Sequence, residues 1–233
     1  MLTDVGERHG ERVMTLRVGE TTMNPDILGA VESVLDHVAR QTIENVVFWF
    51  SGDADSVAGR FPSWQPASSR EDMRYFARWD EALARLSRLR AKTFTAYDGR
   101  CGAAAVQVGF VTDIRLSSSR ARLSLGSLSD GSFPGMGAYW LPKFVGLGNA
   151  RRLFLVGEEL TAERASGLGL IDMIDDTVEA VVDAALKSMR PVTPEAACFT
   201  RRILDDCYVQ ERAAAAELAK AARFKLGMPT QIG

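Results

Sequence analysis

The stretch Asp98–Leu116, which reads DGRCGAAAVQVGFVTDIRL, decides how this chain folds. Just before it, TFTAY at 93–97 contains β-branched and aromatic residues and predicts a strand. The segment DGRCGAAA then predicts a turn from that strand into a short helix, which ends near Asp113. IRLSS, which starts at Ile114, predicts the next strand. Strands and helices in such close succession are typical of an α/β protein.

The same alternation extends toward the amino terminus. RVMTLRV at 12–18 places Met14, Leu16 and Val18 on one face and predicts a strand. NVVFWFS at 45–51 is uncharged and rich in β-branched and aromatic residues, which is typical of a strand buried on both faces. Helices are predicted after the N-cap residue Asn24, and from residue 70 to about residue 90.

Beyond Leu116 the pattern becomes increasingly helical. ARLSL predicts one more short strand, and a glycine-rich loop extends from Gly126 to Gly137. AYWLPKFVG, NARRLFLVG and TAERASGLG predict short helices, the last capped by Thr161, and LIDMI predicts a final strand. Only helical patterns follow, broken by Pro191 and Pro194. The expected organisation is an α/β core domain over 1–175 and a helical region over 176–233.

Composition and charge exclude several classes of protein. The chain has 233 residues, of which 46% are hydrophobic and 25% charged, as in an ordinary globular protein. A formal net charge of −2 leaves no global basic field for nucleic acid. Three cysteines without a CxxC pair argue against a disulfide framework or a structural zinc, so no metal is expected. No apolar stretch is long enough for a spanning helix, so we expect a cytoplasmic protein without a membrane partner.

Three stretches together carry a resemblance to a known family. DGRCGAAAVQVGFVTDIRL, SDGSFPGMGAYWLPKFVGLGNARRLFLVG and ELTAERASGLGLIDMI resemble the crotonase superfamily of enoyl-CoA hydratases and isomerases. The resemblance covers nearly the whole chain in order. It implies a spiral of ββα units with a C-terminal helical trimerisation region, assembled as a homotrimer or hexamer. The chain is most similar to the dehydratase-like members that accompany a type III polyketide synthase in dihydroxyphenylglycine biosynthesis.

The resemblance also implies an oxyanion hole. Acyl-CoA thioesters react through an enolate or a tetrahedral oxyanion, and fixed N–H donors stabilise that negative charge. The resemblance assigns the two backbone donors to Arg60, which follows the AG step in VAGRF, and to Ala104 in the GAAA turn. A helix start supports the second assignment, because the N–H groups of a first helical turn have no intrahelical acceptor. The alternative for this turn is an ordinary close contact between a helix and a strand.

The acid/base chemistry departs from the family pattern. Hydratases of the family use two glutamates, and the matching positions here hold Gln107 and Ser127. A neutral amide can orient water or an acyl group but cannot act as a general base. Asp130, three positions beyond Ser127, is the candidate acid/base. The alternative is that Asp130 supports an Asx turn in SDGS.

The CoA moiety has candidate contacts on the helix predicted from residue 70. The segment 70–92 has seven Lys and Arg residues against four Asp and Glu residues. The resemblance suggests Arg70 and Arg74 as contacts for the CoA phosphates, and the alternative is a solvated helix face. Trp140 is a candidate for the acyl pocket, with core packing as its alternative. CoA is part of the substrate, and no separate cofactor is expected.

These observations imply an acyl-CoA-processing enzyme. The expected activity is that of an enoyl-CoA hydratase/isomerase-like lyase, a dehydratase or isomerase acting on a polyketide-derived CoA thioester. The alternative is a non-catalytic accessory subunit that binds a CoA thioester or assists a type III polyketide synthase. A third hypothesis keeps the fold and changes the reaction to decarboxylation, C–C cleavage or thioester hydrolysis, all of which need the same charge stabilisation.

Overall fold

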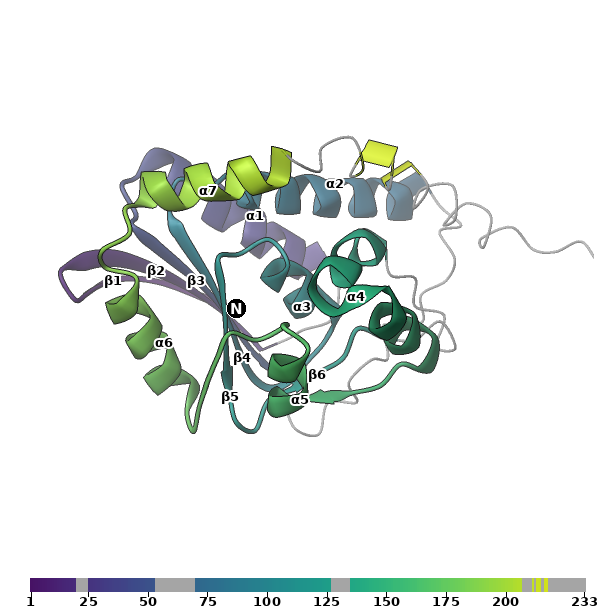
Figure 1. Ribbon diagram of the computed structural model, residues 1–233. Coiled ribbons are helices and arrows are strands. Elements are labelled where there is room, and N and C mark those ends of the chain that lie inside the picture. The colour runs from purple at the N-terminus through teal and green to yellow at the C-terminus, as the bar shows by residue number, and fades with distance from the viewer. Residues whose placement is uncertain are drawn as a thin grey trace, which may run out of the picture.

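The computed structural model describes residues 1–19, 25–52, 70–126, 135–206, 211, 213, 214, 216 and 217, and has a mixed α/β architecture (Figure 1). Its main sheet has the strand order β1-β2-β3-β4-β5-β8. The first pair is antiparallel and the pairs from β2 onward are parallel. These strands are β1 (Leu2–Arg8), β2 (Glu11–Val18), β3 (Asn45–Gly52), β4 (Lys92–Cys101), β5 (Ile114–Ser118) and β8 (Met173–Asp175). The short β6 (Arg122–Leu123) pairs with β4 and with β7 (Leu160–Thr161).

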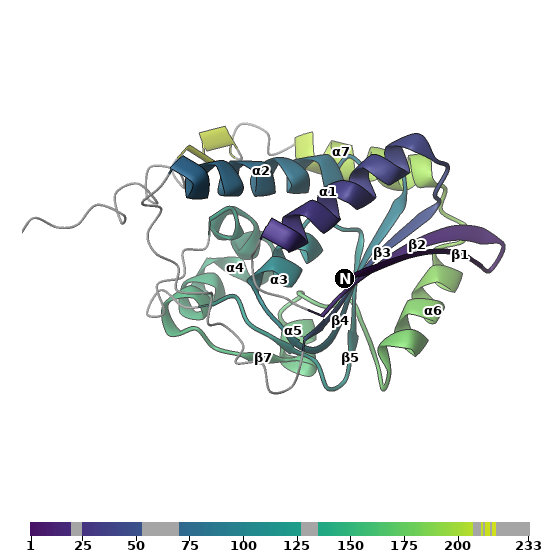
Figure 2. The same ribbon diagram turned by 180° about the vertical axis from the view of Figure 1, so that it is seen from behind.

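Helices cover both faces of this sheet. They are α1 (Pro25–Arg40), α2 (Arg70–Leu86), α3 (Ala103–Gly109), α4 (Gly137–Val156), α5 (Ala162–Gly167), α6 (Val178–Ser188) and α7 (Pro194–Asp206). Helices α1, α2 and α7 form a layer on one side, and α6 packs on the other side (Figures 1 and 2). The residues Met14 and Leu16 of β2 face the first core, whereas Val13 faces the second core beneath α6. The sheet is therefore buried between two apolar layers.

Several predictions from the sequence are confirmed. Met14, Leu16 and Val18 are all at most 2% exposed, as the alternation in β2 requires. Residues 45–50 of β3 are buried without alternation because helices cover both faces of this strand. Thr161 caps α5, where its hydroxyl oxygen accepts a hydrogen bond from the Arg164 N–H at 3.2 Å.

Other element boundaries differ from the predictions. No strand was expected over 2–8, because the residues of the edge strand β1 are largely exposed and show no apolar alternation. Strand β4 continues to Cys101, so DGRC is the end of a strand and only Gly102 separates it from α3. The two helices predicted over 138–157 are joined in α4 across a kink at Gly146, whose φ is 76°. The last strand, β8, is shorter than LIDMI.

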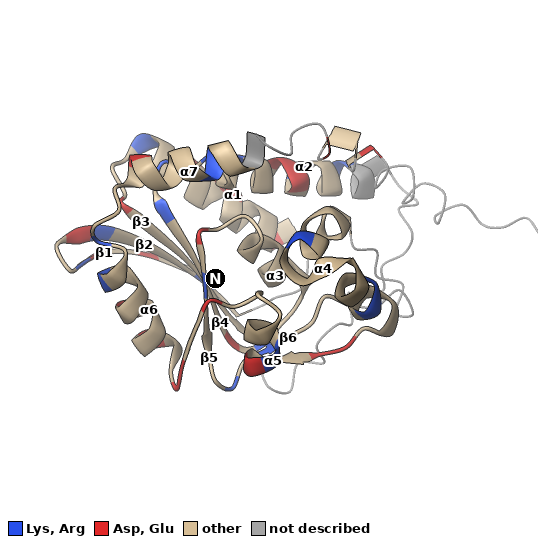
Figure 3. Cartoon of the chain, viewed as in Figure 1, with Lys and Arg blue, Asp and Glu red and all other residues tan. Residues whose placement is uncertain are grey.

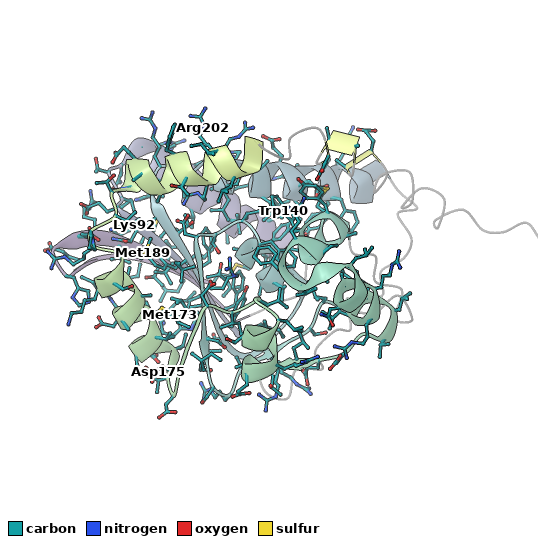
Figure 4. All side chains as sticks on the ribbon, in the orientation of Figure 1. Lys92, Trp140, Met173, Asp175, Met189 and Arg202 are labelled. Atoms are coloured by element: carbon teal, nitrogen blue, oxygen red, sulfur yellow. The ribbon has the colours of Figure 1, made fainter. Side chains whose placement is uncertain are left out.

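A buried ion pair joins the amino-terminal ends of three strands. The fully buried Lys92 ammonium donates to both carboxylate oxygens of Glu11, at 2.9 and 2.7 Å, and to the carbonyl oxygen of Met189 at 3.3 Å. Figure 4 shows Lys92 beside Met189, which follows α6. The Asn45 amide also donates to Glu11, at 2.9 Å. Burial alone would raise the pKa of Glu11, but the hydrogen bonds from Lys92 and Asn45 outweigh it and lower this pKa.

A second buried cation anchors α7. The Arg201 guanidinium donates to the carbonyl oxygens of Ser87 at 3.1 Å and Ala91 at 3.0 Å, and also to that of Leu89. It is paired with the Asp113 carboxylate, which also accepts hydrogen bonds from the Thr93 N–H and hydroxyl. Arg201 thereby fixes α7 to the link between α2 and β4 and to the link between α3 and β5. This contact therefore holds α7 against the links at both ends of the segment that runs from β4 to α3.

We predict that Arg201→Met lowers the free energy of unfolding by about 3 kcal/mol, because it leaves Asp113 and several buried carbonyl groups without their donor. The matched control is Arg202→Met, since Arg202 is exposed on the outer side of α7 (Figure 4). A surface change of this kind should stay within about 0.5 kcal/mol. Urea unfolding followed by circular dichroism measures both. Equal losses in the two variants would contradict the anchoring role.

We also predict that Glu11→Gln destabilises the protein in a pH-dependent way. The pKa of Glu11 is lowered in the folded state, so its stabilising effect is present above the unfolded-state pKa and is lost as the pH falls through the folded-state pKa. The difference in unfolding free energy between wild type and Glu11→Gln should therefore be large at neutral pH and shrink toward pH 3. Glu7→Gln on the exposed β1 is the control. A difference that stays constant with pH would argue against the ion pair.

Candidate active site

The carboxyl-terminal ends of β3 and β4 lie side by side. Their parallel register pairs Ser51 with Asp98 and Gly52 with Gly99. Strand β3 ends at Gly52, and α3 starts at Ala103, directly after β4 and the single residue Gly102. Ligands of open α/β sheets bind outside the carboxyl ends of the strands, so this edge is the natural place for a site. The helix that contains the predicted oxyanion donor Ala104 therefore starts at this edge of the sheet.

Two glycines make this close approach possible. A Cβ atom on Gly52 would lie 1.6 Å from the carbonyl oxygen of Arg100. Gly99 has a φ of +65°, and a Cβ atom there would lie 2.2 Å from the carbonyl oxygen of Gly52. Any other residue at either position would force the two backbones apart. The glycines thus set the distance between the end of β3 and the start of α3.

Helix α3 begins at the candidate oxyanion donor. Its N-cap, Gly102, has an extended backbone and provides no side-chain cap, and the first helical bond runs from the Val106 N–H to the Gly102 carbonyl oxygen at 3.2 Å. The N–H groups of Ala103, Ala104 and Ala105 precede this bond and have no acceptor within the helix. Ala104 is fully buried, and α3 carries no charged residue (Figure 3). The helix start can therefore donate to a negative oxygen in a water-poor environment.

Asp98 supports the strand end from the other side. Its Oδ1 accepts hydrogen bonds from the Ser118 hydroxyl and from Arg120 Nε, both at 2.7 Å. The hydrogen bond from Arg120 holds the pKa of this carboxyl below its usual range, and the Ser118 bond acts in the same direction against burial. Asp98 is therefore an ionised partner of Arg120 that ties β4 to the end of β5.

Cys101 lies at the same strand end but is not a nucleophile. Its side chain is fully buried, and Sγ lies 3.6 Å from the carbonyl oxygens of Phe50 and Asp98, to which it can donate. Burial raises the pKa of the thiol to about 12. The thiolate, which is the reactive form, is therefore scarce at neutral pH.

Gln107 is held by a residue that the sequence analysis did not single out. The Trp79 indole Nε1–H of α2 donates to Gln107 Oε1 at 3.0 Å. Trp79 is fully buried and Gln107 is 6% exposed, so both polar groups lie away from water. A buried amide needs a hydrogen-bond partner. The sequence contains a suitable donor, an indole on the apolar side of a neighbouring helix. Nothing in the sequence shows which donor it is.

The structure describes only some of the other predicted site residues. Arg60, Ser127 and Asp130 lie outside the described residues, so their roles remain predictions. Arg70 is the first residue of α2, and its side chain is likewise not described. Arg74 is exposed on α2, which is compatible both with a CoA contact and with a solvated face. One turn further along this helix, Arg78 is paired with Glu32 of α1 at 2.5 Å.

A cavity of about 370 Å³ adjoins α2 and the start of α4. Its apolar walls include Leu83 and Ala84 of α2, together with Val111, Met136 and Trp140. Trp140 therefore lines a cavity, and Figure 4 shows it between α4 and α2. The acidic residues Asp80 and Glu81 of α2 also border this space, so the α2 side of its wall contains both apolar and acidic residues. The cavity has the size and lining of a site for a small organic group.

Within the part of the chain that the structure describes, no three His, Cys, Asp or Glu side chains are grouped so that they could hold a metal ion. Among the described helices, none combines the length and the apolar character needed to cross a membrane.

Comparisons with known proteins identify the family and the fold of this chain. An enoyl-CoA hydratase from Amycolatopsis orientalis is 29% identical over 100 residues, which are 43% of this chain and 46% of that protein. The match thus spans about half the length of this curated relative. A crystal structure of an enoyl-CoA hydratase/isomerase from Mycobacterium paratuberculosis superposes with a TM-score of 0.79 at 21% identity, covering 98% of this chain and 94% of that one.

A further solved structure is that of a Bacillus subtilis protein assigned as a polyketide-biosynthesis enoyl-CoA hydratase. It has a TM-score of 0.73 at 19% identity and covers 96% of this chain and 90% of that one. These structures show that the chain has the crotonase-type α/β fold expected from its sequence. The family model described as enoyl-CoA hydratase/isomerase matches residues 58–226, most of the chain. The chain therefore belongs to the enoyl-CoA hydratase/isomerase family.

Proposed function

We propose that this protein is an acyl-CoA-processing enzyme that dehydrates or isomerises a CoA thioester by stabilising an enolate. The observation that carries this proposal is the start of α3, where the Ala104 N–H lies buried beside the carboxyl-terminal ends of β3 and β4. An N–H donor in such surroundings stabilises a developing oxyanion by about 3 kcal/mol. Membership of the enoyl-CoA hydratase/isomerase family supports the choice of a thioester oxygen as that oxyanion.

The remaining roles follow from the family resemblance. The Arg60 N–H is the second oxyanion donor, and Asp130 moves the proton at the acyl group. Gln107 and Ser127 occupy the positions of the two hydratase glutamates, where they orient the substrate but remove no proton. Arg70 and Arg74 contact the CoA phosphates. The cavity beside Trp140 receives the acyl group.

The identity of the substrate and the biosynthetic pathway are more specific parts of the same proposal. We infer a polyketide-derived acyl group in antibiotic biosynthesis, with dihydroxyphenylglycine biosynthesis as the specific pathway. The stretches AAAVQV and SDGSFPGMGAYWL support this, as does the likeness to the Bacillus subtilis protein assigned to polyketide biosynthesis. The enzyme is a lyase in the cytoplasm. Region 176–233 serves as a helical trimerisation region appended to the 1–175 core, and the protein is a homotrimer or hexamer.

A second candidate function is that of a non-catalytic subunit that binds a CoA thioester or assists a type III polyketide synthase. The observation that favours it is Gln107, where a hydratase of the family has a carboxylate. Under this hypothesis the oxyanion site binds the thioester oxygen without any later proton transfer. Addition of the protein should then raise the output of the synthase while leaving isolated thioesters unchanged.

The first experiment is mass spectrometry of a panel of 3-hydroxyacyl-, enoyl- and polyketide-like CoA thioesters incubated with the purified protein in D₂O. We expect a protein-dependent loss of water or gain of deuterium. In the same assay, Asp130→Asn should slow turnover by about 100-fold, as expected when an acid/base group is lost. No mass change with thioesters that bind would contradict catalysis. Undiminished turnover in Asp130→Asn would remove this residue from the mechanism.

We further predict that Ala104→Pro lowers turnover by about 100-fold, because proline has no N–H to donate to the oxyanion. Ala103→Pro is the matched control, since it precedes Ala104, keeps the Ala104 N–H and follows an extended Gly102 that suits proline. We expect its turnover to stay within about tenfold of wild type. Thermal unfolding checks that both variants fold. Equal activities in the two variants would show that the Ala104 N–H is not the donor.

A further inference from the structure

A second cavity, of about 440 Å³, lies between α7 and α4 and borders the segment that joins α3 to β5. Its walls come from parts of the chain that are far apart in the sequence, and most of them are apolar. The apolar lining residues include Phe110, Val111, Trp140, Phe144, Met189 and Leu204. This size and this kind of lining are typical of a site for a small organic molecule.

The second cavity shares a wall with the cavity that we assign to the acyl group. Ser87, Val111 and Trp140 border both of them. The remaining walls differ, since Met136 lines only the first cavity and Phe144 lines only the second. A ligand in the second cavity would therefore contact Trp140 from another side than the acyl group does.

Buried polar contacts fix the walls of the second cavity. Arg201, which lines it, holds α7 through the carbonyl oxygens of the link between α2 and β4. Arg115, which also lines it, donates to Asp172 through its backbone N–H and through its guanidinium, each at 2.7 Å. A ligand can thus gain contacts with walls that are already in place, which lowers the cost of binding.

The charged groups on these walls already have partners of opposite charge. Arg201 is paired with Asp113, and Arg115 is paired with Asp172. The Arg115 guanidinium also lies over the Phe144 ring, 4.8 Å from its centroid. An anionic ligand would have to compete with these carboxylates, and a cationic ligand with these guanidinium groups, while burial of an unpaired charge is costly. Charge complementarity therefore favours an uncharged ligand.

The apolar wall favours an aromatic ring. Phe110 and Phe144 are stacked with their centroids 5.3 Å apart, and Trp140 lies one turn before Phe144 on α4. Aromatic rings attract one another in offset and edge-on arrangements, in addition to the effect of the area that they bury. Three aromatic residues around one cavity consequently offer a ring contacts that an alkyl chain of equal size lacks.

We propose that the second cavity is a binding site for an uncharged small molecule with an aromatic ring, and that this site is separate from the site for the CoA thioester. The inference goes beyond the proposed function and does not rest on it, because it follows from the walls of this cavity alone.

The test follows the binding of 4-fluorophenol to the full chain by fluorine NMR of the ligand. This phenol is uncharged at neutral pH, whereas 4-fluorobenzoate and 4-fluorobenzylammonium carry a negative and a positive charge on the same fluorinated ring. We expect saturable binding of 4-fluorophenol, at least about tenfold tighter than that of either charged ring. Absence of saturable binding, or equal or tighter binding of a charged ring, would overturn the proposal.

Thr200→Trp locates the bound ring. Thr200 lines the second cavity from α7 and is exposed, so the larger side chain can enter the cavity without disturbing the core. This variant should weaken the binding of 4-fluorophenol by about tenfold or more, because the indole takes the volume and the apolar contacts of the ligand. The matched control is Ile203→Trp, which adds the same side chain to an exposed position of α7 outside the described lining. Its affinity should stay within about twofold of wild type.

Ala213→Trp distinguishes the two cavities. Ala213 is exposed and lines only the first cavity, so this variant should keep its affinity for 4-fluorophenol. Binding that is lost in Ala213→Trp and kept in Thr200→Trp would place the ring in the first cavity and overturn the proposal. Light scattering of the same variants tests a further occupant. A change of molecular mass in Thr200→Trp, together with no binding of 4-fluorophenol by wild type, would show instead that a second copy of the chain covers this cavity.

Discussion

The close backbone approach of β3 and β4 at Gly52 and Gly99 is the constraint on which the candidate site depends. With side chains at these positions the two strands would have to separate before their ends, because a Cβ atom on either residue would overlap the neighbouring backbone. The parallel pairing instead continues through Gly52, the last residue of β3, which pairs with Gly99 of β4. The end of β3 and the part of β4 that leads toward α3 consequently lie side by side. A pair of backbone donors from two different segments can converge only if their starting points are fixed in this way.

The ion pairs of Lys92 and Arg201, which stabilise the fold, lie at the opposite end of β4 from the candidate site. Glu11, Lys92 and Asn45 all lie at the amino-terminal ends of β2, β4 and β3, and Arg201 joins α7 to residues around the start of β4. The cations Lys92 and Arg201 are buried and paired with part-buried carboxylates, so each pair is costly to disrupt. The opposite end of β4 leads into α3, which carries no charge (Figure 3). The carboxylate at that end, Asp98, is turned toward Arg120 and Ser118. Among the described residues, α3 itself therefore contributes no charge that competes with its backbone N–H groups.

The sequence predicts the parts of this structure that follow from local patterns. The alternation in β2, the uncharged run of β3 and the capping of α5 by Thr161 each leave a direct signal in consecutive residues. Strand β1 leaves none, because an exposed edge strand needs no apolar alternation. The candidate site likewise contains one feature that local sequence patterns predict and one that they do not. The donor role of Ala104 comes from a helix start that is visible in the sequence, whereas the pairing of Gln107 with Trp79 joins residues 28 apart on different helices. Such a contact depends on how α2 packs on α3, and periodicity carries no information about this packing.

The amide at position 107 indicates which groups of the protein can take part in proton transfer in the proposed reaction. A carboxylate there would be almost fully desolvated, since the side chain of Gln107 is buried in an apolar helix beside Trp79. Burial would raise the pKa of such a group, whereas the indole donor and the helix start would lower it, so its protonation would depend on a balance of opposing effects. Glutamine removes this balance and leaves a neutral group of fixed orientation. Any proton that the reaction moves must then come from another segment. Under the proposed function, the described core contributes charge stabilisation and orientation, and the proton transfer is assigned to Asp130, which lies outside the described residues.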